Sequence, residues 1–136
     1  MALDTSNLVE LTMAICDIES VSGNEAALAN EVENLLSSCA HLSVVRDGNA
    51  VVASTNVGLD SRVVIAGHLD TVPIANNLPT QLHHFEREQV IVGRGTVDMK
   101  AGVAVMLKLA VELTNPKFDI TWVFYDNEEV ASELNG

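Results

Sequence analysis

An apolar run that ends abruptly in polar residues constrains the fold of this chain most. Residues 63–67 read Val-Val-Ile-Ala-Gly, and His68 and Asp70 follow directly. The run is typical of a buried strand, and residues two apart in an extended backbone point the same way. The imidazole of His68 and the carboxylate of Asp70 can therefore lie side by side, as in a metal-binding histidine whose tautomer is fixed by a carboxylate. A strand that simply ends in a polar turn explains this stretch alone equally well.

Length, charge and hydropathy limit the class of protein. The 136 residues have the length of one domain, and 48% of them are hydrophobic, which is enough for a core. The net charge of −12 argues against nucleic acid or an anionic membrane as partner, whereas a divalent-cation site tolerates it. No apolar run reaches the ~18 residues of a transmembrane helix. The first residues lack the features of a signal peptide, so we expect a cytoplasmic location.

Hydrophobic periodicity predicts an α/β fold. Helices are expected at 8–18, 26–36 and 102–113, and strands at 42–46, 49–54, 62–67, 89–92 and 119–125. Asp47-Gly48 is typical of a tight hairpin turn between the first two strands. We therefore predict a mainly parallel, mixed central sheet with an antiparallel hairpin at one side and helices on both faces. Cys16 and Cys39 are expected to be small, buried hydrophobic residues without a disulfide.

Two more polar clusters follow apolar runs. A glycine-rich turn, residues 93–98, places Asp98 at a strand-to-helix junction, and it lacks the spacing of a phosphate-binding loop. Glu128 and Glu129 follow the last predicted strand, and adjacent carboxylates require a cation, a proton or solvent exposure. His83 and His84 lie in a segment without periodicity, where we expect solvated side chains rather than metal ligands.

The three clusters can converge, because binding sites in open α/β sheets gather at the carboxyl ends of strands. Zinc accepts imidazole and carboxylate ligands, and a carboxylate can bridge two ions ~3.5 to 4 Å apart. If Asp98 bridges, His68 would bind one metal and Glu129 the other. Each ion then has two protein ligands, whereas about three are usual for catalytic zinc. We therefore expect the missing ligands beyond Gly136. Glu128 is then placed to take a proton from water activated by the metals.

Together the motifs resemble the di-zinc amidohydrolase and peptidase family of aminoacylase, acetylornithine deacetylase and carboxypeptidase G. The resemblance rests on His68-Leu69-Asp70-Thr71-Val72-Pro73, on Gly93-Arg94-Gly95-Thr96-Val97-Asp98-Met99-Lys100-Ala101-Gly102 and on Asp126-Asn127-Glu128-Glu129-Val130. It implies the amino-terminal part of a zinc-exopeptidase-like catalytic domain over residues 1–136. It also implies His68 and Glu129 as terminal ligands of two zinc ions, Asp98 as the bridge before a cis peptide, Glu128 as general base and Asp70 as the group that orients His68. Cobalt or manganese suits the same ligands.

Within this family, residues 68–79 and the Arg46–Asn49 turn are most similar to the actinobacterial members that hydrolyse N-succinyl-LL-2,6-diaminopimelate in lysine biosynthesis. We expect this small N-acyl amino acid as substrate, with an acetylated amino acid or a peptide carboxyl end as alternatives. Family members are longer, with a lid domain, a further acidic ligand and a final histidine ligand. The resemblance thus implies a truncated, inactive chain whose intact form is a homodimer through the lid. A non-catalytic metal-binding or folding fragment is the hypothesis from a different class.

Overall fold

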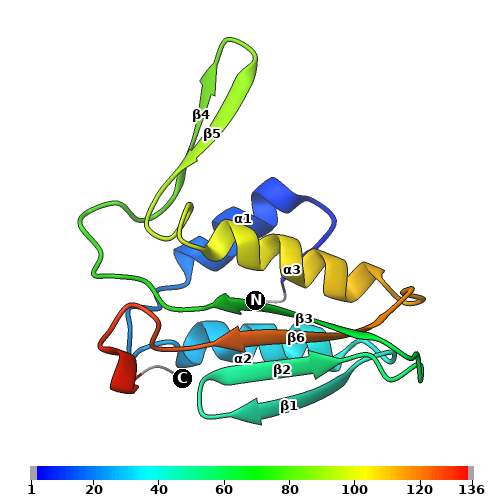
Figure 1. Ribbon diagram of the computed structural model, residues 1–136. Helices are drawn as coiled ribbons and strands as arrows, with labels where there is room; N and C mark the ends of the chain where they lie inside the picture. Colours follow the sequence, from blue (N-terminus) through cyan, green and yellow to red (C-terminus); the bar gives the residue numbers. More distant parts are fainter. Residues whose placement is uncertain (1–2, 135–136) are drawn as a thin grey trace.

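The computed structural model describes residues 3–134, and Figure 1 shows the path of the chain. Its elements, in chain order, are α1 (Leu8–Asp17), α2 (Ala26–Ser37), β1 (Ser43–Asp47), β2 (Ala50–Ser54), β3 (Arg62–His68), β4 (Gln81–Phe85), β5 (Glu88–Val92), α3 (Lys100–Glu112), β6 (Asp119–Tyr125) and the short 3-10 helix η1 (Ser132–Leu134). The three predicted helices and all five predicted strands are present, with ends that differ by a few residues.

The central sheet has the strand order β1-β2-β6-β3. The β1–β2 hairpin is confirmed, and β2 also pairs antiparallel with β6, so that among the strands of residues 3–134 only β3 and β6 pair in parallel in this sheet. The α/β class and the mixed sheet are therefore confirmed, but the prediction of a mainly parallel sheet is wrong for these residues. Two parallel strands need a crossover connection between them. In this sheet, the connection from β3 through α3 to β6 joins neighbouring strands in this way, whereas a tight turn joins β1 to β2.

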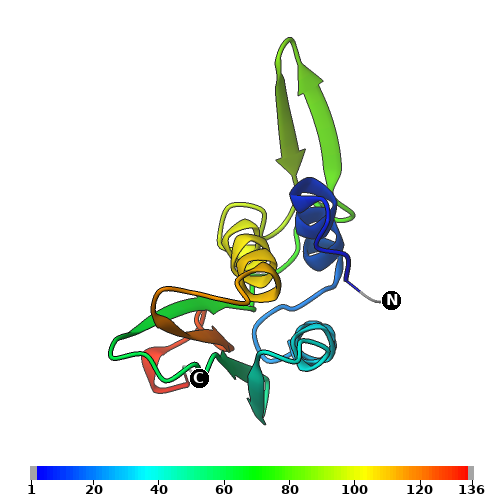
Figure 2. The same cartoon turned by 90° about the vertical axis from the view of Figure 1, so that its right-hand side faces the viewer.

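Alternating burial along β6 shows which face of the sheet carries the core. Ile120, Trp122 and Phe124 are buried, whereas Thr121 and Val123 between them are half-buried. The buried face packs against α2 and α3, which lie on the same side of the sheet in Figure 2. Helices were expected on both faces, and this expectation is wrong for the described residues. Alternation of this kind is the pattern of a sheet that is covered on one side.

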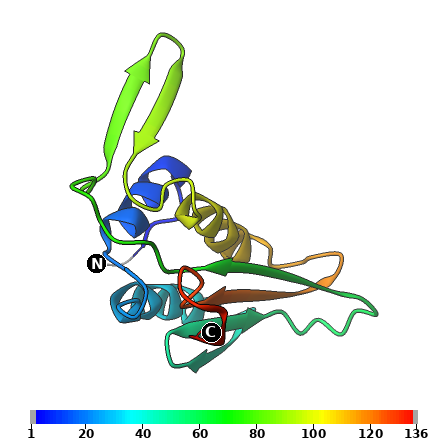
Figure 3. The ribbon, with the colours of Figure 1, turned by 60° about the vertical axis from the view of Figure 1, so that its left-hand side comes forward.

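A two-stranded hairpin, β4–β5, projects from the rest of the molecule (Figures 1 and 3). Strand β4 was not predicted, because four of its five residues are exposed and its sequence, Gln-Leu-His-His-Phe, lacks the apolar run that identified β5. His83 and His84 lie on β4 with exposed side chains, as expected for solvated histidines.

None of the helices within residues 3–134 is long and apolar enough to cross a membrane. Both cysteines are free, Cys16 buried and Cys39 half-buried.

Candidate metal centre

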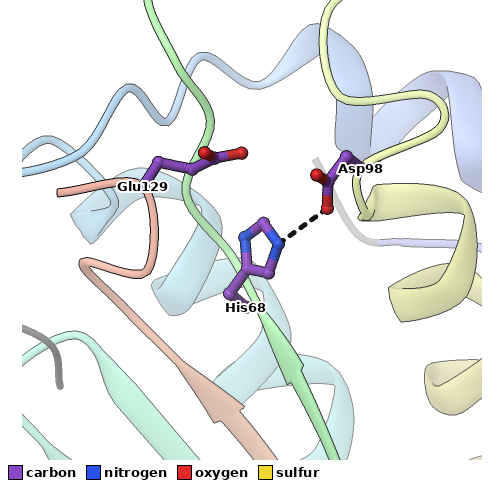
Figure 4. A group of neighbouring side chains, drawn as sticks. All are labelled: His68, Asp98 and Glu129. Carbon is purple, nitrogen blue, oxygen red and sulfur yellow. Dashed lines mark hydrogen bonds and ion pairs between the residues drawn. The ribbon is translucent and has the colours of Figure 1, made fainter. Parts of the chain in front are cut away.

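Three of the predicted site residues meet beyond the carboxyl ends of β3 and β6. His68 is the last residue of β3, Asp98 precedes α3, and Glu129 follows β6. The parallel register of β3 and β6 aligns His68 with Tyr125, so both strands end at the same edge. One potential ligand atom from each of the three residues lies within 4.8 Å of the other two. Figure 4 shows the carboxylates of Asp98 and Glu129 on either side of the imidazole, an arrangement that can hold a cation.

His68 is buried, and both of its ring nitrogens have a partner. Nε2 lies 3.0 Å from Oδ1 of Asp98, and Nδ1 lies 3.0 Å from the backbone oxygen of Asp70. The Asp70 carboxylate is slightly more distant from Nδ1, at 3.3 Å. When Nδ1 carries the proton, it donates a hydrogen bond to the Asp70 carbonyl oxygen, and Nε2 is available as a metal ligand. Burial alone lowers the pKa of His68, but its contacts with Asp98 and Asp70 outweigh burial and raise that pKa.

Several acidic groups surround this one histidine. The Asp98 side chain is 73% exposed, and Oε2 of Glu128 lies 4.0 Å from Nε2 of His68. Burial and the negative charge of Asp98 raise the pKa of Glu129, since a carboxylate is harder to ionise beside others. A divalent cation among these groups would offset the repulsion between the neighbouring carboxylates.

Asp70 is fully buried and has more partners than its predicted contact with His68. Its carboxylate accepts hydrogen bonds from Oγ of Ser22 at 2.6 Å and from the backbone N–H groups of Glu128 and Glu129 at 3.0 and 2.9 Å. Burial raises the pKa of Asp70, but these hydrogen bonds outweigh burial and lower it. Asp70 therefore links the end of β3 to the turn after β6. No spacing in the sequence pointed to Ser22, because its partner is 48 residues away.

The turn before α3 is packed closely enough to require glycine. Gly95 has a φ of +79°, and a Cβ there would lie 2.9 Å from Cγ2 of Thr71 and 3.2 Å from Cδ of Lys100. The Lys100 ammonium is buried and donates to the backbone oxygen of Ile18 at 2.8 Å. Burial lowers the pKa of Lys100 to about 8. The peptide between Asp98 and Met99 is cis, as the family resemblance implied.

A cavity of about 420 Å³ opens beside the candidate metal centre. It is lined mainly by the glycine-rich turn 93–98, together with Val72 and Glu129. Arg94 is the basic residue of this lining, and its Nε is buried without a hydrogen-bond partner among residues 3–134. A buried donor without a partner costs about 1 to 3 kcal/mol, and the lining of the cavity carries the positive charge of Arg94. Arg94 was not singled out from the sequence as a binding residue.

The sequence profile of peptidase family M20/M25/M40 matches residues 64–136, more than half of the chain. A Mycobacterium tuberculosis protein, provisionally assigned as the succinyl-diaminopimelate desuccinylase DapE, is 50% identical over 129 residues. The succinyl-diaminopimelate desuccinylase of Corynebacterium glutamicum is 45% identical over 133 residues. Both alignments cover 94% of this chain and 35% of the relative, so the chain spans about a third of the length of these curated relatives.

The fold also resembles solved structures. Human carnosine dipeptidase 1 superposes with a TM-score of 0.74 at 18% identity, over 94% of this chain and 33% of that one. At this level of identity the similarity concerns the fold alone.

Proposed function

The chain belongs to peptidase family M20/M25/M40, and from this membership we propose that it is part of a metal-dependent amidohydrolase. The proposed reaction is hydrolysis of N-succinyl-LL-2,6-diaminopimelate to succinate and LL-2,6-diaminopimelate. The observation that carries the proposal is the meeting of His68, Asp98 and Glu129, with ligand atoms within 4.8 Å of one another. The substrate is proposed from the names of the two desuccinylases that share 45 and 50% of their aligned residues with this chain.

The ligand atoms at this site fit zinc. One imidazole nitrogen and carboxylate oxygens are ordinary zinc ligands, and cobalt or manganese accepts them too. We propose two zinc ions, with His68 on one, Glu129 on the other and Asp98 between them. When bound, the metal polarises the amide carbonyl and acidifies water. The nearness of the Asp98 and Glu129 carboxylates to the His68 imidazole supports a cation at this place.

Glu128 is the proposed general base. Its Oε2 lies 4.0 Å from Nε2 of His68, at the edge of the site, and the side chain is 42% exposed. A carboxylate at this edge can take a proton from the attacking water and later give it to the leaving amine. Asp70 is the proposed orienting group, since its carbonyl and carboxylate both face Nδ1 of His68.

The presence of Arg94 in the cavity lining supports the proposal that the substrate is an anion. N-succinyl-diaminopimelate carries several carboxylates, and a guanidinium binds a carboxylate well because the fork geometry of the two groups matches. Arg94 lines the same cavity as Asp98 and Glu129, so its positive charge lies beside the proposed metal ligands. An acetylated amino acid or a peptide carboxyl end also carries a carboxylate, so acetylornithine deacetylation and carboxypeptidase activity are the second candidate function.

Parts of the proposed enzyme lie outside residues 1–136. The chain spans about a third of its curated relatives, so we propose that it corresponds to the amino-terminal part of the catalytic domain. The remaining metal ligands and a dimerisation lid would belong to the rest of the intact protein. In this proposal the 136-residue chain alone is inactive, and the intact protein acts as a homodimer on a small molecule.

Replacement of Glu128 tests the proposed reaction. In the intact protein, Glu128→Gln should reduce kcat for N-succinyl-diaminopimelate by about 100- to 10,000-fold, because general-base catalysis typically contributes that factor. Zinc content should stay unchanged, since Glu128 is not a proposed ligand. Glu133→Gln is the matched control, because Glu133 lies in η1 and is exposed. A Glu128→Gln variant with the activity of this control would rule out the general-base role.

A further inference from the structure

The segment Ser20–Glu25, between α1 and α2, runs beside the end of β3, and we call it the brace. The backbone N–H of Ser22 donates to the oxygen of Thr71 at 3.1 Å, and that of Thr71 donates to the oxygen of Ser20 at 2.9 Å. Oγ of Ser20 donates to the oxygen of Leu69 at 2.6 Å. The brace therefore holds the backbone on both sides of Asp70.

Ser22 extends this contact to the Asp70 carboxylate. Its Oγ donates to Oδ2 of Asp70 at 2.6 Å, and the same carboxylate accepts from the N–H groups of Glu128 and Glu129. Because a buried carboxylate is stable only with its hydrogen bonds made, Ser22 helps to fix the acceptor that the turn after β6 uses.

Glu25 gives the brace a second contact with the same turn. It is fully buried, and its Oε1 accepts from the backbone N–H of Gly23 at 2.8 Å and from that of Asn127 at 3.4 Å. Its Oε2 accepts from Nδ2 of Asn49 at 3.3 Å, in the turn between β1 and β2. Asn127 has a φ of +57°, so this turn takes a left-handed conformation directly before Glu128.

We propose that Ser22 and Glu25 are positioning residues for the Glu128–Glu129 turn. In the described part of the chain, the N–H groups of residues 127–129 donate to Glu25 or Asp70. Glu25 belongs to the brace, and Asp70 accepts from its Ser22. The brace thus sets where Glu129 lies relative to His68 and Asp98. A metal site requires its ligands within about 0.2 Å of their ideal distances, so this placement decides affinity. The inference rests on the proposed metal site and names residues of the amino-terminal segment that hold it.

The first test measures the turn without metal. Amide hydrogen exchange at Glu128 and Glu129 is compared in the unchanged chain, Ser22→Ala, Glu25→Gln and the control Ser38→Ala. Ser38 also donates its hydroxyl to a backbone oxygen, that of Leu35 at 2.6 Å, but it is exposed and lies at the end of α2. Exchange should accelerate in the two brace variants and not in the control. Unchanged exchange in both brace variants would overturn the proposal, whether or not the chain binds metal.

The second test measures the consequence for metal binding. Titration with Co²⁺, followed by its visible absorption, should give a dissociation constant about 10- to 100-fold higher in Ser22→Ala, as when outer partners of metal ligands are removed. Ser22→Thr keeps the hydroxyl and should restore most of the affinity, a rescue that a general loss of packing would not give. Faster exchange with unchanged Co²⁺ affinity would overturn the positioning role. No Co²⁺ binding by the unchanged chain would instead refute the proposed metal site in this chain, while the exchange experiment still decides on the brace.

Discussion

Gly95→Ala should destabilise the chain more than Gly48→Ala, and the difference measures how tightly the turn before α3 is packed. Both glycines have positive φ, +79° at Gly95 and +56° at Gly48. An alanine with a left-handed backbone conformation costs about 1 to 2 kcal/mol of stability, regardless of its position in the chain. The two variants therefore share one penalty, and any excess at Gly95 comes from its surroundings.

Those surroundings differ sharply. At Gly48 an added Cβ would meet nothing within 4 Å, whereas at Gly95 it would lie 2.9 Å from Cγ2 of Thr71 and 3.2 Å from Cδ of Lys100. Thr71 and Lys100 are both buried, so neither can withdraw into solvent. Overpacking of this kind costs about 1 to 3 kcal/mol. We expect Gly95→Ala to lower the free energy of unfolding by that amount beyond Gly48→Ala.

Urea unfolding of the three proteins, followed by the fluorescence of Trp122, gives the free energies. Gly95→Ala should also weaken Co²⁺ binding, because the same turn positions Asp98, while Gly48→Ala should leave binding unchanged. Equal free energies of unfolding for the two alanine variants would refute the argument that contact with Thr71 and Lys100 fixes the turn.

Three other residues give independent predictions. Hydrogen bonds from the backbone N–H groups of Val57 and Leu59 lower the pKa of Asp119 to about 2, below its value of about 3.9 in an unfolded chain. Stability from Asp119 is therefore present above pH ~4 and lost as the pH falls towards 2, and Asp119→Asn should flatten this part of a plot of unfolding free energy against pH. Arg94→Met in the intact protein should raise KM for N-succinyl-diaminopimelate more than it lowers kcat, and an unchanged KM would contradict carboxylate binding by Arg94. Val64 is 63% exposed on β3, an edge strand of the sheet, so we expect self-association that Val64→Lys reduces in sedimentation experiments; a monomeric parent chain would contradict this.

The parts of the site that could be predicted from the sequence are those with a local signal. His68, Asp98 and Glu129 each follow an apolar run, and the abrupt change from apolar to polar residues is visible without knowing any partner. Their convergence followed from a general rule for strand ends, and the structure brings their ligand atoms together. Whether they bind metal stays a prediction.

The parts that could not be predicted depend on distant contacts. Ser22 donates a hydrogen bond to Asp70, which is 48 residues away, and Glu25 accepts one from Asn127, which is 102 residues away. Strand direction is equally non-local: the antiparallel pairing of β2 with β6 depends on which strands become neighbours, and hydrophobic periodicity carries no such information. Strand β4 has no buried face, so the period that identifies a half-buried strand is absent.

Anomalous X-ray scattering from crystals of the chain soaked with zinc tests the central claim most directly. The account predicts an anomalous peak that lies ~2.0 to 2.2 Å from Nε2 of His68 and from a carboxylate oxygen of Asp98 or Glu129. Zinc bound only elsewhere, for example at the exposed His83 and His84, or no peak beside His68 at saturating zinc, would contradict it.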